Sequence, residues 1–134
     1  MIYDEFDSER RAIINPEECC RPVEGFPELC IGVFSKPIMD WVLKRFGGLE
    51  ISRFSCCTGT FPIYEVEAYG AKAAVYMPMI GGPAAASVLE ESIPKGGKYF
   101  VFFGAAGVLV KNVSHGKLLL PTAAIRDEGL SYHY

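Results

Sequence analysis

Residues 79–109 read MIGGPAAASVLEESIPKGGKYFVFFGAAGVL, and this stretch decides the fold of the chain. Its Gly-Gly-Pro turn opens a run of small residues that predicts a helix, and Pro94 with the Lys-Gly-Gly turn predicts its end. The aromatic run 98–103 predicts a central strand, and a glycine loop, GAAG at 104–107, follows it. This order is typical of a parallel α/β sheet, in which ligands bind at the carboxyl ends of the strands. The stretch therefore predicts where a site lies before it indicates what binds there.

Composition restricts the class of protein. The chain has 134 residues, half of them apolar, which is enough for one domain with its own core. A net charge of −3 without a basic cluster excludes a nucleic-acid surface. The longest uncharged apolar run, residues 99–110, is shorter than the roughly 20 residues of a membrane span. Many charges among the first eighteen residues predict no signal peptide, and hence a cytoplasmic protein.

The cysteines indicate neither disulfides nor a metal. Four of the five form two adjacent pairs, Cys19-Cys20 and Cys56-Cys57, and the total is odd. No C-x-x-C spacing offers a zinc site. We expect buried or half-buried thiols in a reducing compartment, with Cys30 in the core.

The first half of the chain predicts an arm, a strand and a helix. Residues 1–27 carry three X-Pro breaks and little periodicity, which predicts an N-terminal arm ahead of a domain over 28–134. Residues 29–34 predict a buried strand. Ser35 suits the N-cap of a helix that ends at Gly47-Gly48. The helical spacing predicts its core face, which comprises Ile38, Trp41, Val42 and Phe46.

The next segments predict a sheet with both strand orientations. Residues 49–56 and 62–68 predict strands, and the nearly all-apolar run 71–79 predicts a central one. The tight turn at 69–71 requires antiparallel neighbours, so the sheet is mixed. After the GAAG loop we expect a polar turn at 111–116 and a further strand at 117–124, kinked or at an edge because of Pro121.

The C-terminal tail is the place where acid, base, hydroxyl and imidazole groups gather. These side chains are Arg126, Asp127, Glu128, Ser131 and His133. They can form a binding or acid–base cluster at a strand end. Spacing alone favours the alternative, a solvent-exposed terminus with incidental polar residues.

Three strings carry a family resemblance: IGGPAAASVLEE at 80–91, KYFVFFGAAGVL at 98–109, and HGKLLLPTAAIRDEGLSYHY at 115–134. In order and spacing they resemble the nucleoside phosphorylase superfamily, on the uridine and purine phosphorylase side, over about residues 28–134. The resemblance implies an α/β sandwich with a mixed, largely parallel central sheet and flanking helices. It also implies a homo-oligomer with sites near dimer interfaces, and chemistry without a metal or organic cofactor.

The reaction that the resemblance implies is cleavage of the N-glycosidic bond of a ribonucleoside. Phosphate is the nucleophile in the phosphorylases, and water in related nucleosidases. The two glycine loops and the tail supply the expected substrate-binding residues, while no residue is given a catalytic role. These binding residues are Gly81, Gly82, Gly104, Ala105, Ala106, Gly107, Arg126, Glu128 and His133.

The sequence departs from the family pattern where phosphate binds. Phe102 stands where the phosphorylases have an arginine, and Ala105 where they have Ser or Thr. Residues 32–37 lack the Gly-Asp-Pro turn of the first strand, and 58–60 lack an arginine for the neighbouring subunit. Loss of guanidinium groups removes charge-assisted bonds to a phosphate dianion, and a buried Phe102 offers it no solvation. We therefore expect hydrolysis, or an altered nucleophile, with phosphate a poor co-substrate.

Length is a further departure. In this family the residues that hold the base and the ribose hydroxyls follow the Arg-x-x-Gly segment, which here is 126–129. The resemblance therefore predicts a truncated product or a degenerate copy, with exposed apolar edges and self-association as one remedy. Two functions stay open: an enzyme of the N-glycosidic bond, and a non-catalytic nucleoside-binding or oligomerisation module.

Overall fold

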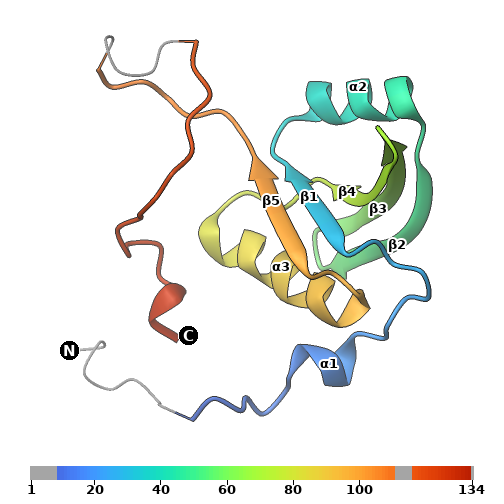
Figure 1. Ribbon diagram of the computed structural model, residues 1–134. Coiled ribbons are helices and arrows are strands. Elements are labelled where there is room, and N and C mark those ends of the chain that lie inside the picture. Colours follow the sequence, from blue (N-terminus) through green and yellow to red (C-terminus); the bar gives the residue numbers. More distant parts are fainter. Residues whose placement is uncertain (1–8, 111–115, 134) are drawn as a thin grey trace.

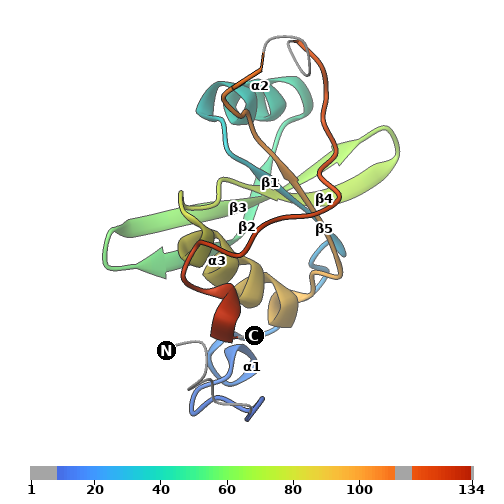
Figure 2. The same ribbon diagram turned by 90° about the vertical axis from the view of Figure 1, so that its left-hand side faces the viewer.

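The computed structural model describes residues 9–110 and 116–133 (Figure 1). Five strands form one sheet in the order β2-β3-β4-β1-β5. Helices α2 and α3 lie on opposite sides of this sheet (Figure 2). The elements in chain order are α1 (Pro16–Cys19), β1 (Leu29–Val33), α2 (Lys36–Phe46), β2 (Leu49–Cys56), β3 (Gly59–Ala68), β4 (Ala71–Tyr76), α3 (Gly82–Lys95), β5 (Tyr99–Phe103) and the short 3₁₀ helix η1 (Ser131–His133).

The sheet is mixed, which confirms the predicted α/β architecture. β1 pairs in parallel with β4 and with β5, and Cys30 lies opposite Ala74 on one side and Phe100 on the other. β2, β3 and β4 form an antiparallel meander. Because β4, β1 and β5 share one direction, their carboxyl ends lie at the same edge of the sheet. The predicted strand-end edge therefore exists.

Each face of the sheet has its own core. The core beneath α3 contains Phe26, Cys30, Phe54, Ile63, Ala74, Tyr76 and Val88. The core beneath α2 contains Val33, Met39, Val66, Ala73 and Val75. Side chains alternate between the faces along a strand, so consecutive residues of β4 serve both cores. This explains why the central strand reads as an unbroken apolar run.

The start and end of α2 agree with the sequence, but its buried face differs in part. Ser35 is the N-cap and Gly47, with φ of 76°, closes the helix. Met39 is the buried residue of the helix, and Val42 and Phe46 pack beside it as predicted. The prediction for Trp41 and Ile38 is wrong, because Trp41 is 57% exposed and its ring packs edge-on against Phe46. The helix is rotated about its axis relative to the expected face.

The β3–β4 turn has the geometry that a two-residue hairpin requires. Tyr69 and Gly70 have φ values of 54° and 80°. Two consecutive left-handed residues match the right-handed twist of the flanking strands. β4 ends at Tyr76, three residues before the predicted end at Met79, and Pro78 stands in the intervening segment. Proline has no N–H to donate to a neighbouring strand.

Two strand predictions need correction. The strand at 98–103 was expected to be central, but β5 lies at the edge of the sheet and four of its five residues are exposed. An all-apolar sequence indicates that both faces of a strand can be buried. It does not indicate whether a second strand pairs with the backbone edge of that strand. The predicted strand at 117–124 does not form: these residues are exposed and have no strand partner, which a strand needs. The predicted turn at 111–116 lies almost wholly outside the described residues, which resume at Gly116.

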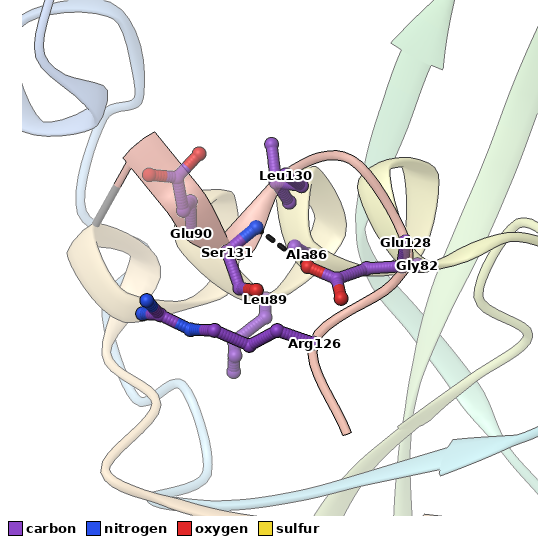
Figure 3. A pocket seen from close by; sticks show the side chains of 8 residues that line it. All are labelled: Gly82, Ala86, Leu89, Glu90, Arg126, Glu128, Leu130 and Ser131. Carbon is purple, nitrogen blue, oxygen red and sulfur yellow. Dashed lines mark hydrogen bonds between the residues drawn. The ribbon is translucent and has the colours of Figure 1, made fainter. Parts of the chain in front are cut away.

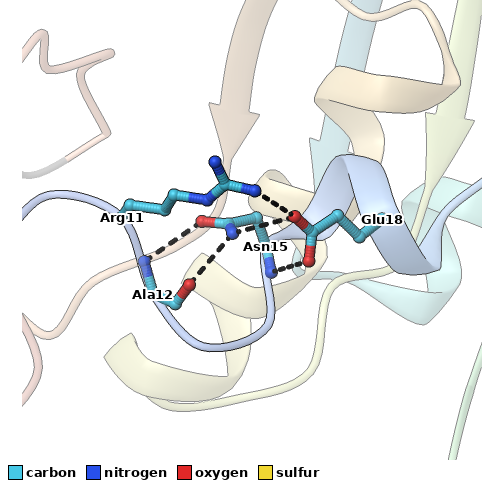
Figure 4. Close-up of polar contacts among 4 residues, drawn as sticks. All are labelled: Arg11, Ala12, Asn15 and Glu18. Atoms are coloured by element: carbon cyan, nitrogen blue, oxygen red, sulfur yellow. Dashed lines mark hydrogen bonds and ion pairs between the residues drawn. The ribbon is translucent and has the colours of Figure 1, made fainter.

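The described part of the N-terminal arm is fastened to the domain. The Val23 N–H donates to the Lys95 carbonyl at 3.1 Å, and Phe26 is buried in the core beneath α3. α1 lies against α3. Ahead of α1, the Asn15 side chain accepts from the Ala12 N–H and donates to the Ala12 carbonyl (Figure 4). Glu18 adds an ion pair with Arg11 at 3.1 Å, which gives this stretch a defined local structure.

The cysteines are unpaired, and most are more exposed than expected. Cys30 is fully buried, and burial raises the pKa of its thiol to about 11. Cys19, Cys56 and Cys57 are exposed, which corrects the prediction of buried or half-buried thiols for these three. Cys56 ends β2 and Cys57 follows it in the β2–β3 turn, and the Cys56 thiol lies 3.0 Å from Oγ1 of Thr58 and 3.8 Å from Sδ of Met79. Among the described residues, no group of cysteines, histidines and carboxylates has the arrangement of a metal site, and no helix could span a membrane.

A tight contact at Gly32 gives a testable prediction for stability. A Cβ atom at this position would lie 2.5 Å from Cδ1 of Phe102 and 2.9 Å from Cγ of Pro78. We expect Gly32→Ala to lower the free energy of unfolding by about 1–3 kcal/mol, because the ring must move out of the strand interface. Urea denaturation measures the change. In a Phe102→Ala background the same substitution should cost clearly less, and an equal cost in both backgrounds would contradict this explanation.

Candidate functional site

The carboxyl edge of the parallel strands leads directly into α3. Residues 77–81 leave β4, and Gly81 takes a φ of 104°, which a residue with a side chain rarely adopts. α3 then begins at Gly82 with Pro83 in its first turn, as predicted. Proline is favoured there because the first N–H groups of a helix have no partner within it. The glycine turn thus places the start of α3 beside the strand ends.

A pocket of about 360 Å³ lies between α3 and the C-terminal tail (Figure 3). The helix and the tail each supply four of its residues. They are Gly82, Ala86, Leu89 and Glu90 from α3, and Arg126, Glu128, Leu130 and Ser131 from the tail. The helical members follow i, i+4, i+7 and i+8 spacing, so they share one face. Two segments more than thirty residues apart in sequence therefore build one site.

Small residues let the tail approach α3 closely. A Cβ atom at Gly82 would lie 2.8 Å from Cγ and 3.1 Å from Cβ of Glu128. Real Cβ atoms do not approach other carbon atoms so closely, so any side chain at Gly82 would push Glu128 away. One turn later, Ala86 adds only a methyl group to the wall. The small residues at the start of α3 therefore allow the tail to pack closely against the helix.

The tail holds its own shape through short-range hydrogen bonds. The Ser131 N–H donates to Oε1 of Glu128 at 2.6 Å, and the Tyr132 hydroxyl donates to the Arg126 carbonyl at 2.8 Å. The Arg126 guanidinium lies over the Tyr132 ring, 5.6 Å from its centroid. These contacts order residues 126–133 into a hook that ends in η1. Arg126, Asp127, Glu128 and His133 are exposed, as the spacing favoured, and these hydrogen bonds give the exposed tail a defined local structure.

The Glu128 carboxylate has an unusually low pKa. Ser131, whose backbone N–H donates to the carboxylate, stabilises the charged form and lowers the pKa of Glu128 from 4.5 to about 2. Glu128 is therefore ionised at any physiological pH. Its stabilising contribution is complete above about pH 4.5 and is lost as the pH falls through about 2, since the folded state then gains a proton that the unfolded state has already bound.

This shift predicts a titration result. We expect the carboxyl ¹³C signal of Glu128 to titrate near pH 2, and Ser131→Pro to move that midpoint toward 4.5, because proline removes the N–H that donates to the carboxylate. A pH titration followed by NMR measures both midpoints. A Glu128 midpoint near 4.5 in the unmodified chain would contradict the hook geometry.

The wall of the pocket is mainly apolar, and its lining residues include one cation and two carboxylates. Arg126 offers several N–H donors, and Glu90 and Glu128 offer acceptors. Ala86, Leu89 and Leu130 supply the apolar surface. Such a set suits a small ligand with hydroxyl groups at one end and a flat, less polar part at the other.

The structure brings together three of the nine residues expected to bind substrate. Gly82, Arg126 and Glu128 line the pocket, and Gly81 stands directly before it. The loop residues Gly104, Ala105, Ala106 and Gly107 are exposed beyond β5 and do not line it, and neither does His133. Sequence reasoning missed Ala86, Leu89, Glu90 and Leu130 as pocket residues, whereas it placed Ser131 in the polar cluster of the tail. Helical spacing counted from Gly82 could have identified the three on α3.

Comparison with known proteins gives the family. The sequence model of the phosphorylase superfamily matches residues 34–134, which is three quarters of the chain. The chain belongs to the phosphorylase superfamily. A uridine phosphorylase of Haemophilus influenzae is 34% identical over 55 residues, which are 41% of this chain and 22% of that relative. The aligned segment thus spans about a fifth of the length of the curated relative.

Phe102 lies in β5, at the position where the family resemblance predicts a phosphate-binding arginine. This residue was expected to be buried, but it is 41% exposed. Its ring lies over Gly32, and its centroid is 6.1 Å from that of Phe34. It thus forms part of an aromatic surface at the strand ends of this phosphorylase-superfamily chain. Among the residues that line the pocket, the guanidinium group comes from Arg126 on the tail.

Proposed function

We propose that this chain supplies one side of the nucleoside site of a phosphorylase-like enzyme that cleaves the N-glycosidic bond of a ribonucleoside. The observation that carries the proposal is the position of the pocket. It lies between the start of α3 and the 126–131 segment, both inside the region that matches the phosphorylase superfamily. We also propose that residues 28–134 form this unit behind an arm at 1–27, and that the protein works in the cytoplasm as a homo-oligomer.

The pocket residues suit the polar groups of a nucleoside. Glu128 is ionised, and its two oxygens accept the N–H groups of Ser131 and Asp127. Each carboxylate oxygen can accept more than one hydrogen bond, so a ribose hydroxyl can donate to a remaining lone pair. Arg126 can donate to a ring oxygen or a carbonyl of the base. Leu89 and Leu130 offer the apolar contact that a flat base needs. Each group therefore has a partner of matching chemistry on the ligand.

The residues of the chain bear on whether phosphate or water attacks the N-glycosidic bond. Phe102 and Ala105 cannot donate charge-assisted hydrogen bonds to phosphate, which favours water. The free N–H groups at the start of α3 favour an anion in the same region. We give more weight to the loss of the side-chain donors, because a phosphate dianion needs strong compensation when it leaves water.

A nucleoside panel tests the activity. Uridine, inosine, adenosine and guanosine are each incubated with the chain, with and without phosphate, and base release is followed by chromatography. We expect release that does not depend on phosphate. Strict dependence on phosphate would contradict the hydrolytic mechanism. The absence of both nucleoside binding and base release would contradict the proposed function.

A second candidate is a nucleoside-binding module without catalysis. It is favoured by the lack, among residues 9–110 and 116–133, of a recognisable nucleophile–base arrangement beside the pocket. This candidate predicts that a nucleoside raises the melting temperature of the chain while no base is released. Any measurable turnover by the chain would exclude it.

A further inference from the structure

A thiol and a thioether meet beside the turn between β2 and β3. Cys56 is the last residue of β2, and Met79 lies in the segment that follows β4. Their sulfur atoms are 3.8 Å apart, and the thiol of Cys56 donates toward the thioether of Met79. Neither residue lines the pocket between α3 and the tail. The fold therefore brings two sulfur ligands together at a place that the proposed function does not use.

Packing fixes one of these sulfur atoms and leaves the other open to solvent. Met79 is half-buried and packs against the core beneath α3. Cys56 is exposed, and so is the next residue, Cys57. An ion can thus reach the thiol from solvent and meet a thioether that is already in position. Preorganised ligands of this kind lose little conformational entropy when they bind.

The surroundings of Cys56 favour its thiolate, which is the form that binds metals. Oγ1 of Thr58 lies 3.0 Å from Sγ of Cys56. Hydrogen bonds from the side chain and the backbone of Thr58, and then from the backbone of Gly59, lower the pKa of the Cys56 thiol below its ordinary value. Partial desolvation and the Glu91 carboxylate oppose this shift, but the negative charge of Glu91 also attracts a cation.

The two ligand types select a class of metal. Thiolate and thioether sulfur are soft ligands that suit Cu(I), whereas Mg²⁺ and Ca²⁺ prefer oxygen. Zinc sites are built from thiolates, imidazoles and carboxylates, and iron–sulfur clusters are held by thiolates. Within the described ranges, no group of cysteines, histidines and carboxylates is arranged for a metal of those kinds. A methionine beside a cysteine therefore indicates a soft monovalent cation.

The separation of the two sulfur atoms suits a single ion. A metal–sulfur bond of about 2.3 Å, the length found in zinc sites, allows one ion to contact both atoms at 3.8 Å with an angle of about 110° between the bonds. The ion then takes the place of the proton in the S–H···S contact. A bent arrangement leaves a third position open, and Cys57 is the exposed thiol that follows in the chain.

We propose that Cys56 and Met79 form a binding site for Cu(I). When the ion binds, the S–H bond of Cys56 breaks, its proton passes to water, and one metal bond forms to each sulfur atom. No atom changes its oxidation state, so the step needs no oxidant or reductant. Because neither residue lines the proposed nucleoside pocket, the metal site can be tested independently of the nucleoside proposal.

NMR of the methionine methyl groups tests the proposal, with Ag(I) as an air-stable probe of the same class. The whole chain is labelled with ¹³C in these methyl groups and titrated with Ag(I) to saturation. We expect the Met79 methyl signal to shift, because its sulfur becomes a ligand. The signals of Met39 and Met77, which belong to the core beneath α2, should stay in place. Zn²⁺ should leave the Met79 signal unchanged, since a thioether is not a zinc ligand.

Two substitutions separate this site from simple capture by exposed thiols. Met79→Leu keeps an apolar side chain of similar size and should weaken Cu(I) binding at least about tenfold, measured without oxygen by competition with a coloured chelator. The measurement is made in a Cys19→Ser background, which breaks up the other adjacent pair of thiols. Met77→Leu is the matched control and should leave the affinity unchanged. Cys56→Ser should abolish the Ag(I) shift of the Met79 methyl signal.

Three results would overturn the proposal. The first is a Met79 methyl signal that does not move at saturating Ag(I), which needs no substitution and so does not depend on any variant folding. The second is an equal loss of Cu(I) affinity from Met79→Leu and Met77→Leu. The third is a Met79 shift that persists in Cys56→Ser, because the thioether would then bind the ion without the thiol.

Discussion

Tyr76→Ala is expected to lower the free energy of unfolding by about 3–5 kcal/mol, as large-to-small changes of buried aromatic residues do. Tyr76 is fully buried in the central strand, and its ring packs edge-on against Phe54 with centroids 5.2 Å apart. Its hydroxyl also lies 3.5 Å from Oγ of Ser92 on α3. Truncation leaves a cavity between the sheet and α3, together with a weakened aromatic contact.

Two other tyrosine variants control this measurement in urea denaturation. Tyr76→Phe keeps the ring and removes only a long hydrogen bond, so we expect it to cost about 1 kcal/mol or less. Tyr69→Ala, at a position that is 95% exposed, loses the edge-on ring contact with Phe46 and should cost about 1 kcal/mol or less. A Tyr76→Ala effect as small as the Tyr69→Ala effect would contradict the position of β4 at the centre of the sheet.

Gly82→Leu is expected to weaken nucleoside binding at least about tenfold, which corresponds to about 1.4 kcal/mol. Even a Cβ atom at Gly82 would lie 2.8 Å from Cγ of Glu128, and the rest of a leucine side chain would enter the pocket. The tail must then move away from α3, and Arg126 moves with it. Isothermal titration calorimetry with uridine or inosine measures the loss.

Gly107→Leu is the matched control for this prediction. Gly107 belongs to the other glycine loop, and a Cβ atom there would meet nothing within 4 Å. We expect this variant to bind nucleoside as the unmodified chain does. A larger loss from Gly107→Leu than from Gly82→Leu would transfer the binding site to the loop at 104–107.

Local signals were sufficient to predict most of the fold. Ser35 before the helix, Gly47 after the last helical turn, and the Tyr69-Gly70 turn each determine their own geometry, so the corresponding boundaries were predictable. The apolar run at 71–79 also identified the central strand, because both faces of β4 are covered.

The errors concern properties that depend on distant parts of the chain. YFVFF predicts a strand, but nothing in those five residues says that β5 has one neighbouring strand rather than two. Trp41 is compatible with a core by its chemistry, yet the orientation of α2 leaves it at the surface. The pocket depends on a contact between Gly82 and Glu128, and no spacing within either segment encodes that contact.

Amide NMR shows whether a nucleoside binds between α3 and the tail. A ¹⁵N chain titrated with uridine or inosine should show saturable shifts for Gly82, Ala86 and Ser131, with Glu128→Gln and Arg126→Ala each weakening the response. Absence of saturable shifts at these amides, or shifts confined to residues 104–107, would contradict the account.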